Sequence, residues 1–253
     1  MLKKRFHVDL VEWGLYTLMV MMASVAIYRY VTVEDPAAAL RARFGDAHWS
    51  HGAEEWIVRA HFADRRGGVF LDVGSADPRE GSNTYFLESA LGWTGVAIDA
   101  QAEYADAYRT HRPNTQFYSF FVSDRSDDTA VLFVDRDRPG SSSSDRGFTE
   151  TYSPDGDIEE RHVPTITLND LLPRAGIEAI DFVSMDIELA EPQALAGFDL
   201  PRYRPALVCV EQYRVTAQWL LDYFGTHGYT PVAEYLRIDP HNYWFAPIGA
   251  RTR

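Results

Sequence analysis

The chain has 253 residues, 46% of them hydrophobic and 13% aromatic, which is enough for one large α/β domain with a sizeable core. Its 24 basic and 37 acidic side chains give a formal net charge of −13, which argues against nucleic acid as the main partner because phosphate binding needs a basic surface. The single cysteine, Cys209, rules out an intramolecular disulfide and a zinc site built on cysteines, and no metal site is predicted.

The beginning of the chain predicts a membrane anchor. A basic tail, residues 1–9, is followed by an apolar run from Trp13 to Tyr28, which extends over residues 10–33 when its two flanking charges lie at the membrane interfaces. About 20 mostly apolar residues span a bilayer, and aromatic residues at both ends are typical of such a span. We therefore expect one transmembrane helix over residues 10–33, in a membrane such as the inner membrane of a bacterium.

A cleaved signal peptide is the alternative for this run, but the run is long and no clear small-x-small cleavage site precedes the folded part. The density of Lys3, Lys4 and Arg5 near the span slightly favours a cytoplasmic N-terminus. That orientation would place the main domain on the far side of the membrane.

A linker and helical lead-in, residues 34–66, connects the anchor to the main domain, residues 67–253. Pro36 suits the first turn of a helix that runs to Phe44, and residues 54–62 have the pattern of a second helix.

The stretch from Gly67 to Asp99 is typical of a βαβ unit. The apolar residues 69–73, bounded by glycines, predict a central parallel strand that is buried on both faces. Residues of N-cap type at 82–84 precede a helical pattern, and residues 95–98 predict the next strand.

Strands and helices alternate along the rest of the chain, which predicts a three-layer α/β fold with a mostly parallel sheet of about seven strands. The other strand candidates are residues 117–122, 130–134, 163–168, 180–185 and 206–210, followed by a closing antiparallel hairpin of residues 232–238 and 243–245. Residues 135–157 are rich in Ser, Gly, Asp and Pro, without an apolar period, and form either a mobile lid or a long excursion.

Four predicted strands end in acidic residues, which are Asp72, Asp99, Asp186 and Glu211. The carboxyl ends of parallel strands share one crevice, where a carboxylate after the second strand can accept two hydrogen bonds from a ribose diol. The first turn lacks both G-x-G-x-x-G and a lysine-bearing phosphate loop, which favours a nucleoside without phosphates. S-adenosylmethionine fits, because its sulfonium and amino group suit an acidic site.

Two blocks of sequence are similar to those of a known family. Phe70 to Asp77, FLDVGSAD, matches a D-V-G-A-x-D-G turn, and Met185 to Phe198, MDIELAEPQALAGF, matches D-V-E-G-x-E-x-x-x-L-x-G-F. On these blocks, in this order and spacing, the chain resembles the FkbM family of S-adenosylmethionine-dependent methyltransferases. The resemblance implies a Rossmann-like class I methyltransferase fold for residues 67–253.

The resemblance also implies roles for ten residues. The cofactor-binding residues would be Asp72, Gly74 and Ser75 at the methionine end, Asp99 at the ribose, Asp124 near the adenine, and Asp77 and Asn83 beside them. Asn83 has a second interpretation as a helix cap. The catalytic residues would be Asp186, Glu188 and Glu211, beside an acceptor hydroxyl whose proton one carboxylate takes.

Two departures from the family pattern bear on activity. Pro78 and Leu189 stand where the family has glycine, and the leucine side chain would either occupy ligand space or change the path of the turn. One hypothesis is therefore a membrane-anchored methyltransferase that acts on a hydroxyl of a small molecule, sugar or lipid. The alternative is a non-catalytic single-span subunit of a larger membrane complex, for example a respiratory or photosynthetic one.

Overall fold

The computed structural model describes residues 35–249, so the predicted basic tail (1–9) and transmembrane helix (10–33) lie outside the described residues. The chain divides into two compact units after Ala38, and the fold set out below is that of the unit that begins at Ala39. Among the helices within residues 35–249, none is long and apolar enough to cross a membrane.

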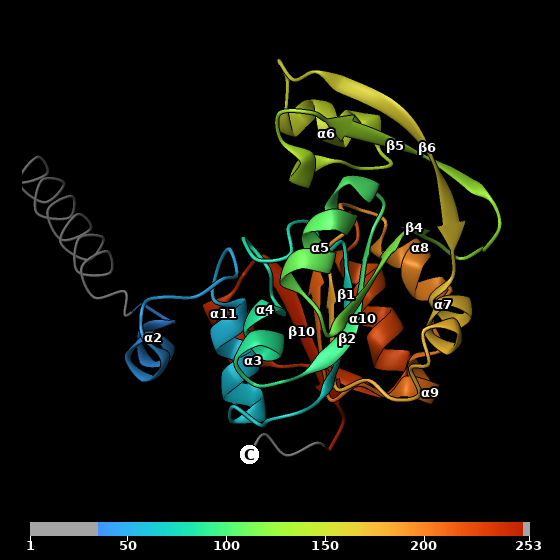
Figure 1. Cartoon of the computed structure of the whole chain (residues 1–253). Coiled ribbons are helices and arrows are strands. Elements are labelled where there is room, and N and C mark those ends of the chain that lie inside the picture. Colours follow the sequence, from blue (N-terminus) through green and yellow to red (C-terminus); the bar gives the residue numbers. More distant parts are fainter. Residues whose placement is uncertain (1–34, 250–253) are drawn as a thin grey trace, which may run out of the picture. The chain divides into compact units, whose positions relative to one another are not determined.

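A seven-stranded sheet forms the centre of this unit, as the sequence predicted (Figure 1). Its strands are β1 (Val69–Val73), β2 (Thr94–Asp99), β3 (Thr115–Ser119), β7 (Phe182–Met185), β8 (Leu207–Glu211), β9 (Tyr229–Pro231) and β10 (Asn242–Pro247), in the spatial order β3-β2-β1-β7-β8-β10-β9. The pairs β1–β2, β1–β7, β2–β3 and β7–β8 are parallel, whereas β10 is antiparallel to both β8 and β9. Asp72, Asp99 and Asp186 therefore come to the same edge of the sheet.

Helices cover both faces of the sheet (Figure 1). One face carries α3 (Glu54–Phe62), α4 (Tyr85–Ser89), η1 (Ala102–Tyr104) with α5 (Ala105–His111), and α11 (Ala233–Ile238). The other face carries α7 (Leu168–Arg174), α8 (Glu191–Ala196), α9 (Leu200–Tyr203) and α10 (Ala217–Thr226). The helix predicted at residues 54–62 has the bounds observed for α3, and the first helix, α2 (Ala38–Phe44), begins two residues after Pro36.

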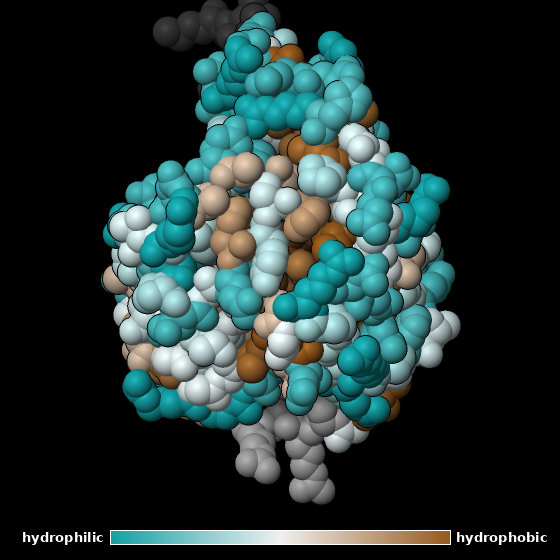
Figure 2. All heavy atoms as spheres, turned by 45° about the vertical axis from the view of Figure 1, so that its right-hand side comes forward, coloured by the Kyte–Doolittle hydropathy of each residue, from teal (hydrophilic) through white to brown (hydrophobic). Residues whose placement is uncertain are grey.

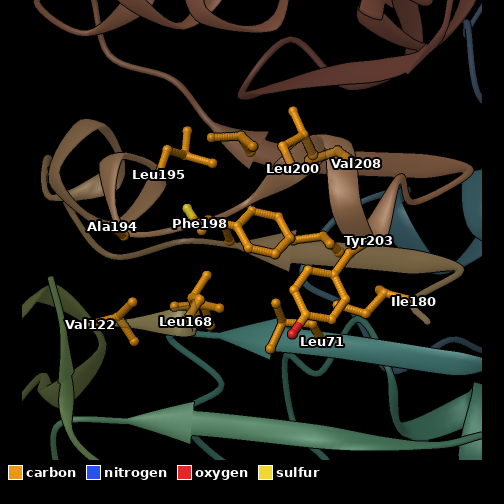
Figure 3. Close-up of a cluster of buried hydrophobic side chains, with 14 of the residues drawn as sticks. Leu71, Val122, Leu168, Ile180, Ala194, Leu195, Phe198, Leu200, Tyr203 and Val208 are labelled. Carbon is orange, nitrogen blue, oxygen red and sulfur yellow. The ribbon is translucent and has the colours of Figure 1, made fainter. Parts of the chain in front are cut away.

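The main core lies between the sheet and the helices α7 to α10. Leu71 and Val208 from the sheet meet Leu168, Leu195 and other fully buried residues of these helices (Figure 3). Burying a leucine contributes about 1.5–3 kcal/mol, so this layer fixes where the strands end and hence where the acidic residues lie.

A second sheet of three strands is built from β4 (Phe121–Val122), β6 (Ile158–Ile166) and β5 (Thr129–Asp135), in that order. We call residues 129–166 the excursion; between its strands it also holds η2 (Pro139–Ser141) and α6 (Arg146–Tyr152). Figure 2 shows hydrophobic residues at the surface between the upper lobe of that view and the body of the domain. Beneath the surface, Leu132 and Val163 of the excursion share a buried cluster with Ala190. The stretch at 135–157 thus contains a helix, α6, that the sequence analysis did not predict.

Four strand predictions are wrong in detail. The candidate at 117–122 is split, because β3 leaves the main sheet at Ser119 and β4 joins the second sheet. The candidates at 130–134 and 163–168 likewise belong to the second sheet. The candidate at 232–238 is helix α11, and the partner of β10 is the three-residue strand β9, whose Pro231 limits it to an edge position.

Candidate functional site

A cavity of about 390 Å³ lies at the carboxyl ends of β1, β2 and β7, a volume that suits a small-molecule ligand. Its wall is formed by His51, residues 72–76, residues 80–83, residues 98–101, residues 120–122, Leu132, residues 139–142, Ser184 and residues 186–188. The wall also includes His51 from the lead-in, and Leu132 and residues 139–142 from the excursion.

The structure brings seven of the ten predicted site residues onto this wall, namely Asp72, Gly74, Ser75, Asn83, Asp99, Asp186 and Glu188. Asp77, Asp124 and Glu211 are not on it. Asp77 accepts the backbone N–H groups of Arg79 and Glu80 and so closes a turn. The cofactor-binding and catalytic roles of all ten residues stay predictions.

Asp124 lies at an exposed position beside α8. Its carboxylate accepts hydrogen bonds from the Gln193 amide (3.3 Å) and the Ser123 hydroxyl (3.1 Å), and these bonds lower its pKa. Its contacts are therefore with the surface of the domain and not with the cavity.

At Gly74 the loop that follows β1 comes into close contact with the loop that follows β7. Its φ of +79° is in the left-handed region, and a Cβ atom there would lie 1.7 Å from the backbone oxygen of Asp186. The space beside the Gly74 Cα is thus occupied by the Asp186 backbone. This contact sets Asp72 and Asp186 side by side.

Asp99 has the geometry that a diol requires. One carboxylate oxygen accepts the N–H of Ala76 (2.9 Å) and the other accepts the N–H of Gln101 (2.8 Å), so each keeps a lone pair for a further donor. Burial raises the pKa of Asp99 to about 6, and it raises the pKa of Asp72 to the same value although Thr84 donates to Asp72 at 2.6 Å.

Asp186, Glu188 and Glu211 form a cluster whose carboxylate oxygens lie within 4.8 Å of one another. The Tyr213 hydroxyl is 2.6 Å from Oε2 of Glu188 and 2.8 Å from Oε1 of Glu211. Burial raises the pKa of all three acids, and for Glu188 and Glu211 the charge of Asp186 adds to it. The spacing would also admit a divalent cation, which the sequence did not predict.

Protons are shared within this cluster. The single hydroxyl proton of Tyr213 cannot serve two carboxylates at once, and the pKa of Tyr213 is raised far above its ordinary value by burial. The pKa of Glu211 is the most strongly raised of the three, by burial first and then by the charge of Asp186, whereas the pKa of Glu188 is raised to about 7. Asp186 is open to the cavity and lies within the field of His51, whose charge opposes the effect of burial on the pKa of Asp186.

The bulky Leu189 does not fill the cavity. Glu188 and Leu189 both have positive φ values, +53° and +80°, so the turn follows the left-handed path that a glycine takes easily. Leu189 is absent from the cavity wall, which holds Glu188 instead. The departure is accommodated as backbone strain of about 1–2 kcal/mol per residue, and the pocket stays open.

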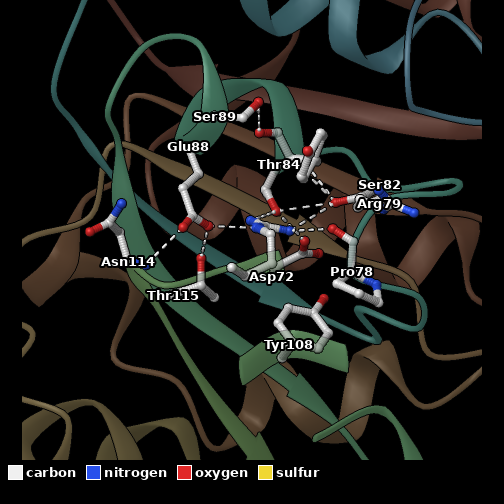
Figure 4. A network of polar contacts seen from close by, with 12 residues as sticks. Asp72, Pro78, Arg79, Ser82, Thr84, Glu88, Ser89, Tyr108, Asn114 and Thr115 are labelled. Carbon is white, nitrogen blue, oxygen red and sulfur yellow. Dashed lines mark hydrogen bonds and ion pairs between the residues drawn. The ribbon is translucent and has the colours of Figure 1, made fainter. Parts of the chain in front are cut away.

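A buried ion pair supports the cavity wall from behind (Figure 4). Arg112 and Glu88 are both buried and salt-bridged, and the Arg112 guanidinium also donates to the Pro78 carbonyl (2.9 Å) and the Thr84 hydroxyl (3.0 Å). Thr84 in turn donates to Asp72. Pro78, the second departure from the family pattern, therefore anchors the first turn through its carbonyl oxygen.

His51 and Tyr213 are site residues that sequence reasoning missed. His51 lies 21 positions before Asp72 in the chain, in the lead-in, and no local pattern marks it. Tyr213 follows Glu211 by two positions, so its side chain returns to the same side of an extended segment, and that spacing was a usable signal.

These features define an α/β protein with a nucleoside-sized acidic cavity at the carboxyl edge of its sheet. The methyltransferase FkbM domain matches residues 72–236, which is more than half of the chain. The chain therefore belongs to the FkbM methyltransferase family, and its fold is the Rossmann-like class I methyltransferase fold with a seven-stranded, mostly parallel sheet. Comparison with curated proteins finds no match.

Several solved structures are similar in fold. A TehB-like SAM-dependent methyltransferase from Corynebacterium glutamicum has 13% identity and a TM-score of 0.44, with 82% of this chain and 92% of that chain covered. Cofactor-bound Rv0187 from MTB has 13% identity and a TM-score of 0.43, with 90% of this chain and 97% of that chain covered. A SAM-dependent methyltransferase from Thiobacillus denitrificans in complex with S-adenosyl-L-homocysteine has 10% identity and a TM-score of 0.39, with 80% of this chain and 76% of that chain covered. These scores are too low to relate individual site residues.

The raised pKa of Asp99 predicts a pH-dependent stability. A carboxyl that titrates at about 6 in the fold and at 3.8 in the unfolded chain stabilises the fold at low pH, and that stabilisation is lost as the pH rises through this range. The free energy of unfolding of Asp99→Asn, relative to that of the wild type, should therefore increase by about 2 kcal/mol as the pH rises from 4 to 8. Urea unfolding at both pH values measures this change. The exposed-turn variant Asp155→Asn, as the control, should track the wild type, and a constant gap for Asp99→Asn would contradict the prediction.

Proposed function

We propose that this chain transfers a methyl group from S-adenosylmethionine to a hydroxyl oxygen of a small molecule, sugar or lipid. The observation that carries the proposal is Glu188, a carboxylate with a pKa of about 7 on the wall of the acidic cavity of an FkbM-family domain. A general base works best when its pKa lies near the working pH.

The cavity fits the cofactor chemically. The Ser75 hydroxyl is buried on the wall and has no hydrogen-bond partner among the described residues, so it is a donor that a ligand would satisfy. Asp99 keeps lone pairs for the ribose diol of the cofactor. Asp72 offers a carboxylate that suits the cationic amino group of the cofactor. When bound, S-adenosylmethionine supplies the methyl group: the new O–C bond forms as the C–S bond breaks, and the electron pair stays on sulfur.

The acid cluster handles the proton of the acceptor. Glu188 accepts that proton as the acceptor oxygen bonds to the methyl carbon, and Tyr213 holds the Glu188 carboxylate in place through its hydroxyl. The raised pKa of Glu211 keeps the charge of the cluster low, which allows three acids to lie so close together.

The excursion supports an acceptor position next to Glu188. The Ser143 hydroxyl donates to the Glu188 backbone oxygen (2.6 Å), which ties the excursion to the acidic turn. Phe148 of α6 lies edge-on to Tyr213, with ring centroids 5.1 Å apart, and Tyr152 follows it as an exposed aromatic residue. An aromatic surface beside a base suits a hydroxylated ring or chain with an apolar side.

We further propose that residues 10–33 hold the enzyme in a membrane, through the apolar run that the sequence contains. Full-length protein should then stay in the membrane pellet after an alkaline carbonate wash. S-adenosylmethionine is made in the cytoplasm, so an active enzyme needs its domain on that side, which is the orientation opposite to the one that Lys3, Lys4 and Arg5 slightly favour. An accessible tag at the C-terminus in intact cells would contradict the proposal.

Calorimetry on the full-length chain tests the proposed activity. We expect S-adenosylmethionine and S-adenosylhomocysteine to bind with micromolar affinity, and labelled methyl groups to pass to an acceptor in a lipid or sugar extract. Absence of binding, together with co-purification in a stoichiometric membrane complex, would instead establish the non-catalytic subunit.

A further inference from the structure

The charge of the cavity leaves one part of the cofactor without an obvious partner. Five acidic side chains line the wall, at positions 72, 80, 99, 186 and 188, and His51 is the sole wall residue of the described chain that can carry a positive charge. The ammonium and sulfonium of S-adenosylmethionine suit the acids. Its carboxylate would be repelled by them unless a cationic donor lies close to it.

His51 is held at the cavity by the first turn of the domain. The backbone oxygen of Trp49 accepts the N–H of Gly81 (2.8 Å), and Ser50 and Gly81 form a parallel bridge. Gly81 has a φ of +77°, and a Cβ atom there would lie 2.3 Å from Nε2 of His51. The absence of a side chain at Gly81 therefore makes room for the imidazole, whose ring is exposed to solvent on the cavity wall.

The sheet order separates Asp99, the proposed ribose position, from Asp186, the carboxylate on which the charge of His51 acts. Asp99, at the ribose position, ends β2, while Asp186 follows β7, two strands away across β1, or about 10 Å at the usual strand spacing. The charge of His51 acts on Asp186, whereas the charges that act on Asp99 come from Asp72 and Glu103. A ligand with its ribose at Asp99 thus extends across β1 toward His51.

We propose that His51 binds the carboxylate of the methionine moiety of the cofactor, with Ser75 and Asn83 as neutral donors near it. This inference rests on the proposed function. His51 lies outside residues 72–236, the segment that matches the family domain, so the lead-in would complete the cofactor pocket of this chain. The buried Arg112 cannot take this role, because its guanidinium is engaged by Glu88, Pro78 and Thr84.

Binding of two ligands that differ only in the carboxylate tests the proposal. The full-length chain, His51→Gln and the control His111→Gln are titrated calorimetrically with S-adenosylmethionine and with decarboxylated S-adenosylmethionine. His111 is an exposed histidine at the end of α5, away from the cavity wall. Because both ligands use the same folded protein, the ratio of their affinities is insensitive to a general loss of stability.

We expect His51→Gln to weaken S-adenosylmethionine binding by about tenfold to a hundredfold, the range of a hydrogen bond to a charged group, and decarboxylated S-adenosylmethionine by less than about twofold. His111→Gln should leave both affinities unchanged. An equal loss for both ligands in His51→Gln, or no loss for either, would overturn the inference while leaving the proposed function standing. Failure of the wild type to bind either ligand would overturn both.

Discussion

Replacing Arg112 by leucine should lower the free energy of unfolding by about 3–5 kcal/mol, the largest effect on stability that we expect from the loss of a single charged side chain in this chain. The Arg112 side chain is fully buried, and its removal would leave the Glu88 carboxylate buried with only the Asn114 N–H and the Thr115 hydroxyl as donors. A buried charge without its counter-ion is far less stable than a buried pair. Urea unfolding at pH 7 measures the loss.

A nearby arginine provides the control for this prediction. Arg109, three residues earlier on α5, pairs with Asp106 in solvent, so Arg109→Leu should change stability by less than about 0.5 kcal/mol. The double variant Arg112→Leu/Glu88→Leu should recover part of the loss, because it removes the unpaired charge. A loss below about 1 kcal/mol for Arg112→Leu would show that the network is dispensable.

The network connects Pro78, one of the two departures from the family pattern, with the shape of the pocket, whereas Leu189 is accommodated separately. Pro78 cannot donate a backbone hydrogen bond, but its carbonyl oxygen receives one from Arg112, and this holds the turn that leads to Gly81. Leu189 adopts a positive φ, the left-handed backbone conformation that glycine takes easily, and this conformation costs free energy. Both substitutions are thus compensated locally, and the cavity retains its wall.

The sequence allowed the parts of the fold that depend on local patterns to be predicted. The apolar run of β1, the glycine turn and the aspartate that ends β2 are neighbours in the chain, so the βαβ unit and its acidic edge follow from short-range preferences. The same holds for the seven-stranded, mostly parallel sheet, because each crossover brings the next strand back in the same direction.

Other features depend on contacts between distant residues and left no local trace. The apolar stretch 117–122 has one continuous pattern, but its second half, β4, pairs with β6, some 40 residues later in the chain. Residues 232–238 contain Val232, Tyr235 and Leu236 at helical spacing as well as a strand-like composition, and the packing of Tyr235 on Trp244 decides for the helix. His51 comes to the cavity wall from the lead-in, and its ring lies in the space that a side chain at position 81 would share.

Replacing Glu188 by glutamine should lower the rate of methyl transfer by a factor of about 10² to 10⁴, the usual contribution of a positioned general base. Glutamine keeps the size of the side chain but cannot take a proton. The affinity for S-adenosylmethionine should stay within about threefold of that of the wild type, because the loss concerns the proton of the acceptor. Single-turnover transfer of labelled methyl groups, with the acceptor identified in the extract, measures the rate, and calorimetry measures the affinity.

The pH profile gives this prediction a readout that a merely structural role would not move. Glu188 acts as a base only when ionised, so the wild-type rate should rise with pH through its pKa of about 7 and then level off. The hydrogen bond from Tyr213 lowers the pKa of Glu188, so Tyr213→Phe should shift the rising limb to higher pH while leaving the plateau within about tenfold. Glu150→Gln, an exposed glutamate on α6 paired with Arg146, serves as the control and should leave rate and profile unchanged. A Glu188→Gln variant with the wild-type rate, or a Tyr213→Phe profile that does not move, would assign the proton to another group.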